Sequence, residues 1–216
     1  ISGSFWIVLT GVLATASCGL LGTFLVLRKM SLLGDALSHA VLPGIAIAFL
    51  LSGSRAIVPM FLGATLFGLV TTLLVEAFHT KWQVQEDASI GVVFTALFAL
   101  GVVLITAFAG QVDLDQECVL YGEIAYTPWD LLLWGEYSLG PRPVWILGGV
   151  LAVNLLLVTL FYKELKIASF DPAMAVSVGI NATLIHYLLM AMVSLTTVAS
   201  FESVGAILVV AMLIVP

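Results

Sequence analysis

One apolar run of this chain carries two ionisable side chains: Arg28-Lys29-Met30-Ser31-Leu32-Leu33-Gly34-Asp35-Ala36-Leu37-Ser38-His39-Ala40-Val41-Leu42-Pro43-Gly44. Asp35 and His39 are spaced i and i+4, so on a helix both side chains lie on one face. An ionisable group within an apolar span costs about 3 kcal/mol and is usually retained where it faces a pathway, a partner or a bound ion. Carboxylate and imidazole are also ligands for divalent first-row metal ions. We therefore take Asp35 and His39 as candidate metal ligands.

Each of these side chains also has an ordinary interpretation. Asp35 is explained equally well by an intramembrane hydrogen bond to a neighbouring helix, and His39 by burial in a core. One turn further on, Pro43-Gly44 is expected to weaken the helix, because proline removes a backbone donor and leaves a carbonyl free. A break beside an ionisable pair points to a binding site or a moving part.

The composition predicts a polytopic membrane protein. The 216 residues are 62% hydrophobic and 9% charged, and their mean hydropathy of +1.19 is far above that of a soluble domain. Apolar runs of membrane-spanning length, about 20 residues each, recur at residues 5–27, 32–52, 57–78, 88–109, 144–162, 182–200 and from 204 to the end. Gly and Pro within these runs fit membrane helices better than barrel strands. We expect an all-α bundle of at least seven spans, forming a single domain over residues 1–216.

Charge placement predicts the orientation of the chain. The basic residues are concentrated in three alternate connections: Arg28, Lys29, Lys81, Lys163 and Lys166. The positive-inside rule puts these connections in the cytoplasm and the N-terminus outside.

An acidic segment of residues 110–142 is then external. Asp113, Asp115 and Glu117 lie within it, and an acidic surface raises the local concentration of cations and can dock a partner. A solvated loop is the alternative. Within the segment, residues 129–134 are expected to form an interfacial helix, because Trp flanks the apolar residues at both ends.

A short helix is predicted at about residues 171–179 on the cytoplasmic side. Asp171 suits the N-cap, Pro172 the first helical position, and Gly179 the residue just past the end. Met174 and Val178, at i and i+4, would form an apolar stripe that fits a groove on a soluble partner. A simple linker would need neither cap.

Two further ionisable residues, His186 and Glu202, lie at the ends of apolar runs. His186 is expected to be an interfacial side chain at the start of the sixth run, and Glu202 lies either at the external surface or in a re-entrant break. The sequence contains no G-x-x-x-x-G-K-[ST], H-E-x-x-H or G-x-S-x-G motif. These absences argue against P-loop ATP binding and against the common zinc-peptidase and serine-hydrolase sites.

The run from Met30 to Gly44 closely resembles the membrane permease of the manganese, zinc and iron ABC importers. The likeness continues through further blocks: Asp87-Ala88-Ser89-Ile90-Gly91, Val112-Asp113-Leu114-Asp115 with Val119-Leu120-Tyr121-Gly122-Glu123, Ser169-Phe170-Asp171-Pro172, and Phe201-Glu202-Ser203-Val204-Gly205-Ala206-Ile207-Leu208-Val209-Val210-Ala211. It covers essentially the whole chain. Family chains continue past the position of Pro216, so we expect this permease domain to be incomplete at its C-terminal end.

The resemblance implies a permease like those of type II ABC importers, located in the inner (plasma) membrane of a bacterium. It implies a second permease chain in a homo- or heterodimer, a cytoplasmic ABC ATPase, and an extracellular or periplasmic metal-binding protein. Asp35 and His39 would line the metal pathway. The residues expected to contact the ATPase are Phe170, Asp171, Pro172, Ala175 and Gly179.

We therefore predict a transport subunit that carries Mn²⁺, Zn²⁺ or Fe²⁺ by alternating access, with Mn²⁺ favoured by the resemblance alone. The chain would have no enzymatic activity, no cofactor other than the transported ion, and no nucleic-acid partner. One rival is an intramembrane metal-dependent enzyme using Asp35 and His39, which lacks a third ligand and a nucleophile motif. The other is a passive metal channel, which would not associate with an ATPase.

Overall fold

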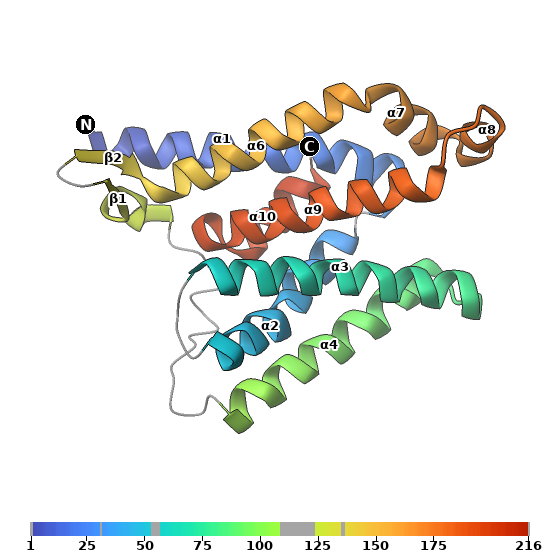
Figure 1. Cartoon of the computed structure of the whole chain (residues 1–216), viewed down its shortest axis with the longest axis horizontal. Coiled ribbons are helices and arrows are strands. Elements are labelled where there is room, and N and C mark those ends of the chain that lie inside the picture. The colour runs from blue at the N-terminus through green and yellow to red at the C-terminus, as the bar shows by residue number, and fades with distance from the viewer. Residues whose placement is uncertain (1, 31, 53–56, 109–123, 135–136, 216) are drawn as a thin grey trace. The chain divides into compact units, whose positions relative to one another are not determined.

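The computed structural model describes residues 2–30, 32–52, 57–108, 124–134 and 137–215 (Figure 1). The chain divides into two compact units: Leu32–Gln116, and Ile1–Ser31 together with Glu117–Pro216. Six helices among the described residues are long and apolar enough to cross a membrane: Gly3–Leu27, Leu32–Ser52, Pro59–Trp82, Asp87–Phe108, Arg142–Leu160 and Ala182–Phe201. The predicted polytopic helical bundle is confirmed, and its organisation as a single domain stays a prediction.

The smaller unit is built around α2 (Leu32–Ser52). This helix packs against both α3 (Ile57–Trp82) and α4 (Glu86–Phe108) (Figure 1). Near its C-terminal end, Ala46 on α2 is buried in a cluster with Ile105 on α4. The helix that carries the candidate metal ligands is thus the central helix of its unit.

Glycine residues bring the neighbouring helices close to α2. A side chain on Gly44 would overlap the carbonyl oxygen of Gly63 on α3, and a Cβ on Gly63 would lie 2.6 Å from the carbonyl oxygen of Gly44. On α4, a Cβ on Gly101 would lie 2.9 Å from both Cδ and N of Pro43. Small residues permit this backbone approach in membrane helices. The expected weakening at Pro43-Gly44 does not end the helix, because α2 continues to Ser52 with α3 and α4 packed against this turn.

The larger unit contains most of the described elements. In chain order they are α1 (Ser2–Leu27), the 3₁₀ helix η1 (Ile124–Trp129), β1 (Leu131–Trp134), β2 (Tyr137–Pro141), α6 (Arg142–Leu160), α7 (Tyr162–Phe170), α8 (Pro172–Ser177), α9 (Ala182–Val204) and α10 (Ala206–Ile214). Helix α1 packs against α6, α9 and α10, and α9 also packs against α6. Buried Asn154 on α6 donates a hydrogen bond to Thr196 Oγ1 on α9 at 2.7 Å.

The last apolar run does not form a single long helix in the described residues. Helix α9 ends at Val204, Gly205 adopts φ +84°, and α10 begins at Ala206. A positive φ of this kind favours glycine. The chain changes direction between α9 and α10 (Figure 1). Gly205 lies three positions after Glu202. The described part of the chain therefore has six candidate spans, where the sequence predicted seven.

The interfacial helix expected over residues 129–134 is wrong. Here β1 pairs with β2 in an antiparallel hairpin, with Trp134 opposite Tyr137. A six-residue helix gains little stability of its own, whereas aromatic residues favour strands and the following segment supplies a partner. The hairpin is closed by a hydrogen bond from the backbone N–H of Arg142 to the carbonyl oxygen of Asp130 at 2.8 Å.

Candidate functional site

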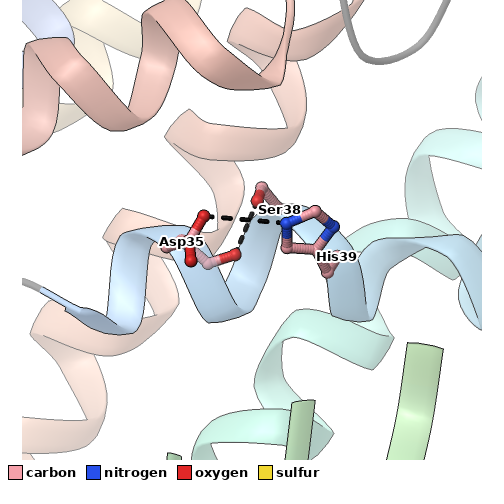
Figure 2. Close-up of polar contacts among 3 residues, drawn as sticks. All are labelled: Asp35, Ser38 and His39. Carbon is pink, nitrogen blue, oxygen red and sulfur yellow. Dashed lines mark hydrogen bonds and ion pairs between the residues drawn. The ribbon is translucent and has the colours of Figure 1, made fainter. Parts of the chain in front are cut away.

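Helix α2 carries Asp35 and His39 on the same face (Figure 2). His39 Nε2 lies 3.7 Å from Asp35 Oδ1, and the two side chains are 32% and 47% exposed, respectively. The helix thus brings the two predicted ligands together, and both remain partly accessible.

The separation of these two atoms suits a shared ion better than a hydrogen bond. At 3.7 Å they are beyond the usual range of N–H···O bonds. A zinc ion sits about 2.1 Å from each nitrogen or oxygen ligand, so a bridging ion can reach both atoms without a movement of the helix. Among the described residues, no third His, Cys, Asp or Glu completes a cluster. Any further ligands must come from the backbone, from water or from elsewhere.

Two local features change the backbone hydrogen bonding around the pair. Ser38 Oγ donates a hydrogen bond to the Asp35 carbonyl oxygen at 2.5 Å (Figure 2). Pro43 has no N–H, so the carbonyl oxygen of His39 lacks the donor that a helix normally supplies four residues on. The turn that carries both side chains therefore also carries a carbonyl oxygen without its usual helical partner.

Two phenylalanines of α4 surround the imidazole of His39. The Phe94 ring centre lies 5.8 Å from that of His39 at an interplanar angle of 30°, and Phe98 makes an edge-to-face contact at 5.5 Å and 82°. Both distances fall within the range of aromatic pairing. Neither phenylalanine was among the site residues predicted from the sequence. Their i and i+4 spacing within an apolar run was a readable signal for a shared face, but not for which helix that face contacts.

Asp113, Asp115 and Glu117 lie outside the described residues, so their role stays a prediction. The side chain of Glu202 is likewise outside what the structure describes.

The second predicted element, at residues 171–179, contains α8. Asp171 Oδ1 accepts a hydrogen bond from the backbone N–H of Met174 at 2.9 Å, and Pro172 occupies the first helical position. Both residues thus mark the N-terminus of α8. Asp171 accepts from a backbone N–H that has no partner within the helix, and Pro172 lacks an N–H at a position where the helix needs none.

The C-terminal end of α8 is closed by a Schellman motif. Gly179 adopts φ +86°, its N–H donates to the Val176 carbonyl at 3.0 Å, and the N–H of Ile180 donates to the Ala175 carbonyl at 2.9 Å. Asn181 then caps α9 by accepting from the N–H of Leu184 at 3.1 Å. Every turn between α7 and α9 is therefore held by a specific cap.

All residues of α8 except Ala175 are exposed. Met174 and Val178 are 54% and 62% exposed, and Phe170 just before the helix is 67% exposed. Ala175, by contrast, is fully buried within this chain. Ala175 packs inside the permease itself, so its side chain does not form the surface contact with an ATPase that was expected at this position.

Comparison with known proteins places this chain. The family model of the ABC 3 transport family matches residues 4–216. The chain belongs to this family. It is 56% identical over 211 residues to the manganese transport system membrane protein MntD of Bacillus subtilis, covering 98% of this chain and 71% of that protein. It is 45% identical over 210 residues to the zinc transport system membrane protein TroD of Treponema pallidum, covering 97% of this chain and 57% of that protein.

The fold is also found among solved structures. A chain of PsaBC from Streptococcus pneumoniae in complex with Fab matches with a TM-score of 0.75 at 35% identity, covering 99% of this chain and 70% of that one. The ABC 3 family and these relatives confirm a multi-pass membrane permease of bacterial type, rather than an enzyme.

Proposed function

We propose that this chain is the permease subunit of an ABC importer for a divalent transition-metal ion, with Mn²⁺ ahead of Zn²⁺ and Fe²⁺. The observation that carries the proposal is the Asp35–His39 pair, which lies on a membrane-spanning helix of an ABC 3 family chain. Relatives whose names specify manganese and zinc transport support this class of cargo.

The chemistry of the pair suits an ion that must leave again. One carboxylate and one imidazole bind any divalent first-row metal, with intrinsic affinity rising toward zinc. Two side-chain ligands alone hold the ion loosely, and conduction requires a site that is favourable enough to enter yet weak enough to leave. Selectivity for Mn²⁺ must therefore come from ligands added to Asp35 and His39, or from delivery of the ion.

Helix α8 is the proposed contact with a cytoplasmic ATPase. Three exposed apolar side chains suit a hydrophobic groove on a soluble partner: Met174 in α8, Val178 at its C-cap and Phe170 at the end of α7. ATP-driven movement at α8 would alternate access to the metal site between the two sides of the membrane. A second permease chain and an external metal-binding protein complete the proposed importer, with Asp113, Asp115 and Glu117 attracting cations or docking that protein.

The test is uptake of radioactive manganese by cells that lack their own importer and express the complete transport system. Uptake should require the ATPase, so an ATPase variant that binds but does not hydrolyse ATP should reduce uptake to background. Undiminished uptake with that variant would support a passive channel instead. Metal-dependent catalysis by the chain without ATPase would favour the enzyme alternative.

The contact at α8 is tested by a matched pair of variants. Met174→Glu places a charge on the exposed apolar stripe, whereas Ala173→Glu adds the same charge to an exposed position one residue away. Met174→Glu should lose the copurifying ATPase and Ala173→Glu should retain it. Equal retention in both variants would remove α8 as the docking element.

A further inference from the structure

The last residue before the turn that ends α1 is Arg28, just outside the candidate span Gly3–Leu27. The turn is another Schellman motif: the N–H of Lys29 donates to the Val26 carbonyl at 3.0 Å and the N–H of Met30 donates to the Leu25 carbonyl at 3.0 Å. Lys29 takes the left-handed conformation that this motif requires, with φ +61°. The backbone at Arg28 is therefore firmly oriented.

The guanidinium of Arg28 bridges two elements distant in sequence. Its Nε donates to Ser169 Oγ on α7 at 3.1 Å, and its NH1 lies 3.1 Å from His186 Nδ1 on α9. Because arginine has donors only, Nδ1 accepts this bond and the imidazole is neutral, with its proton on Nε2. Burial lowers the pKa of the guanidinium, but arginine remains charged at physiological pH.

These two contacts flank the connection that carries α8. Ser169 precedes the N-cap Asp171 by two residues, and His186 follows the α9 cap Asn181 by five. Within α8 itself, the side chain of Ala175 is fully buried. The connection from α7 to α9 is therefore tied on both flanks to the end of α1 by one side chain.

We propose that Arg28 is a positioning residue for energy coupling, which holds both flanks of the α8 connection against the end of α1 so that movement imposed on α8 reaches α1. This inference rests on the proposed function of α8. Arginine suits the role because its rigid fork presents donors in two directions. Lysine places one charge at the end of a flexible stem and cannot reproduce that geometry.

The geometry also argues against the idea that Arg28 serves only to set the orientation of the chain in the membrane or to keep the end of α1 soluble. A side chain that only marks the cytoplasmic flank needs no directed partners, and the neighbouring Lys29 is exposed. Arg28 instead has one nitrogen, NH2, buried with no hydrogen-bond partner among the residues that the structure describes. A buried donor without a partner is costly, so keeping the Arg28 guanidinium in this position lowers the stability of the surrounding structure.

The experiment compares Arg28→Gln with the control Lys29→Asn in the complete transport system. Both substitutions remove one positive charge from the same flank, and Asn tolerates the left-handed conformation at residue 29. For each variant we would measure membrane abundance, copurifying ATPase, ATP hydrolysis in proteoliposomes, and metal ions imported per ATP. Arg28→Gln should lower the number of ions imported per ATP at least about tenfold, with the ATPase still bound. Lys29→Asn should match the wild type.

Equal ions per ATP in Arg28→Gln and Lys29→Asn would overturn the inference. If Arg28→Gln does not accumulate in the membrane, Ser169→Ala and His186→Leu each remove one partner and leave Arg28 in place. Both should lower the ions imported per ATP, and wild-type values in both would equally overturn the inference. Arg28→Lys should restore abundance but not the full coupling ratio, which separates positioning from charge. A wild-type system without ATP-dependent uptake would instead contradict the proposed function.

Discussion

His39 and His186 differ in the charge of the neighbouring side chain and in its separation along the sequence. His39 is 3.7 Å from a carboxylate four residues away on its own helix, whereas His186 is 3.1 Å from a guanidinium 158 positions away. The first gap leaves room for an ion, and the second is closed by a hydrogen bond. A carboxylate attracts a divalent cation, while a guanidinium repels it. The same side chain is thus suited to binding cargo in α2 and to tying elements together in α9.

The difference in sequence separation has a mechanical consequence. A pair within one helical turn moves with its helix and constrains nothing else. A bond between α1 and α9 restrains the relative positions of both helices. A substitution of Asp35 should therefore change transport with little effect on stability, while substitutions around Arg28 should affect both.

The largest expected effect is at Asp35 and His39, the proposed metal ligands. Asp35→Ala and His39→Ala should each lower metal uptake at least about 10- to 100-fold, because loss of a ligand is at least as severe as loss of a ligand's supporting partner, which costs about 10- to 100-fold. Asp35→Asn, which keeps size and hydrogen bonding but loses the anionic oxygen, should fail as well. Uptake assays at matched membrane abundance check this, and wild-type rates would show that the pair is structural.

A smaller effect on uptake is expected at Phe98 of α4, which contacts the His39 imidazole. Phe98→Ala removes the edge-to-face contact with His39, worth about 0.5–1.5 kcal/mol for such a pair. The metal concentration for half-maximal uptake should rise by roughly twofold to tenfold, while Phe98→Tyr should keep the wild-type value. No change in Phe98→Ala would mean that His39 is oriented by its own helix alone.

Two serines allow a matched test of the contrast between the sites. Ser169 Oγ accepts from charged Arg28, whereas Ser38 Oγ donates to a neutral carbonyl within its own helix. Ser169→Ala should lower the free energy of unfolding by about 2 kcal/mol, and Ser38→Ala by about 1 kcal/mol or less. Reversible unfolding in detergent measures both. The reverse order would contradict the view that the Arg28 contacts are the stronger restraint.

The smallest effect is expected at Lys29, whose φ of +61° is a conformation that glycine adopts without strain. Lys29→Gly should raise the free energy of unfolding by about 0.5–1 kcal/mol and leave uptake unchanged. The opposite change at the matching position of α8, Gly179→Ala, should destabilise by a similar amount. Lower stability in Lys29→Gly would indicate that the lysine side chain itself makes a stabilising contact.

Features set by local chemistry were predictable from the sequence. The bounds of α2 coincide with the apolar run at 32–52, and Asp171, Pro172 and Gly179 mark the region of α8 because caps act on the nearest backbone groups. The spacing of Asp35 and His39 likewise needed only the helical period.

Features that depend on distant pairing were not predictable in the same way. The hairpin replaced the helix expected at 129–134 because strand β1 finds its partner in β2, a contact that residue spacing does not encode. Small, apolar Ala175 has the same helical pattern whether it faces a partner or its own chain. His186 was expected to be an interfacial side chain, and only the packing of α1 against α9 brings Arg28 within reach.

The glycine contacts around α2 bear on how sequence variation in this family is read. At Gly44, Gly63 and Gly101 any larger residue would have to push α3 or α4 away from α2. Selection on these positions acts through helix spacing, whichever ion the transporter carries. Their identity across transporters of different metals would therefore say nothing about cargo. Information on the choice of metal has to be sought among positions that can vary without moving a helix.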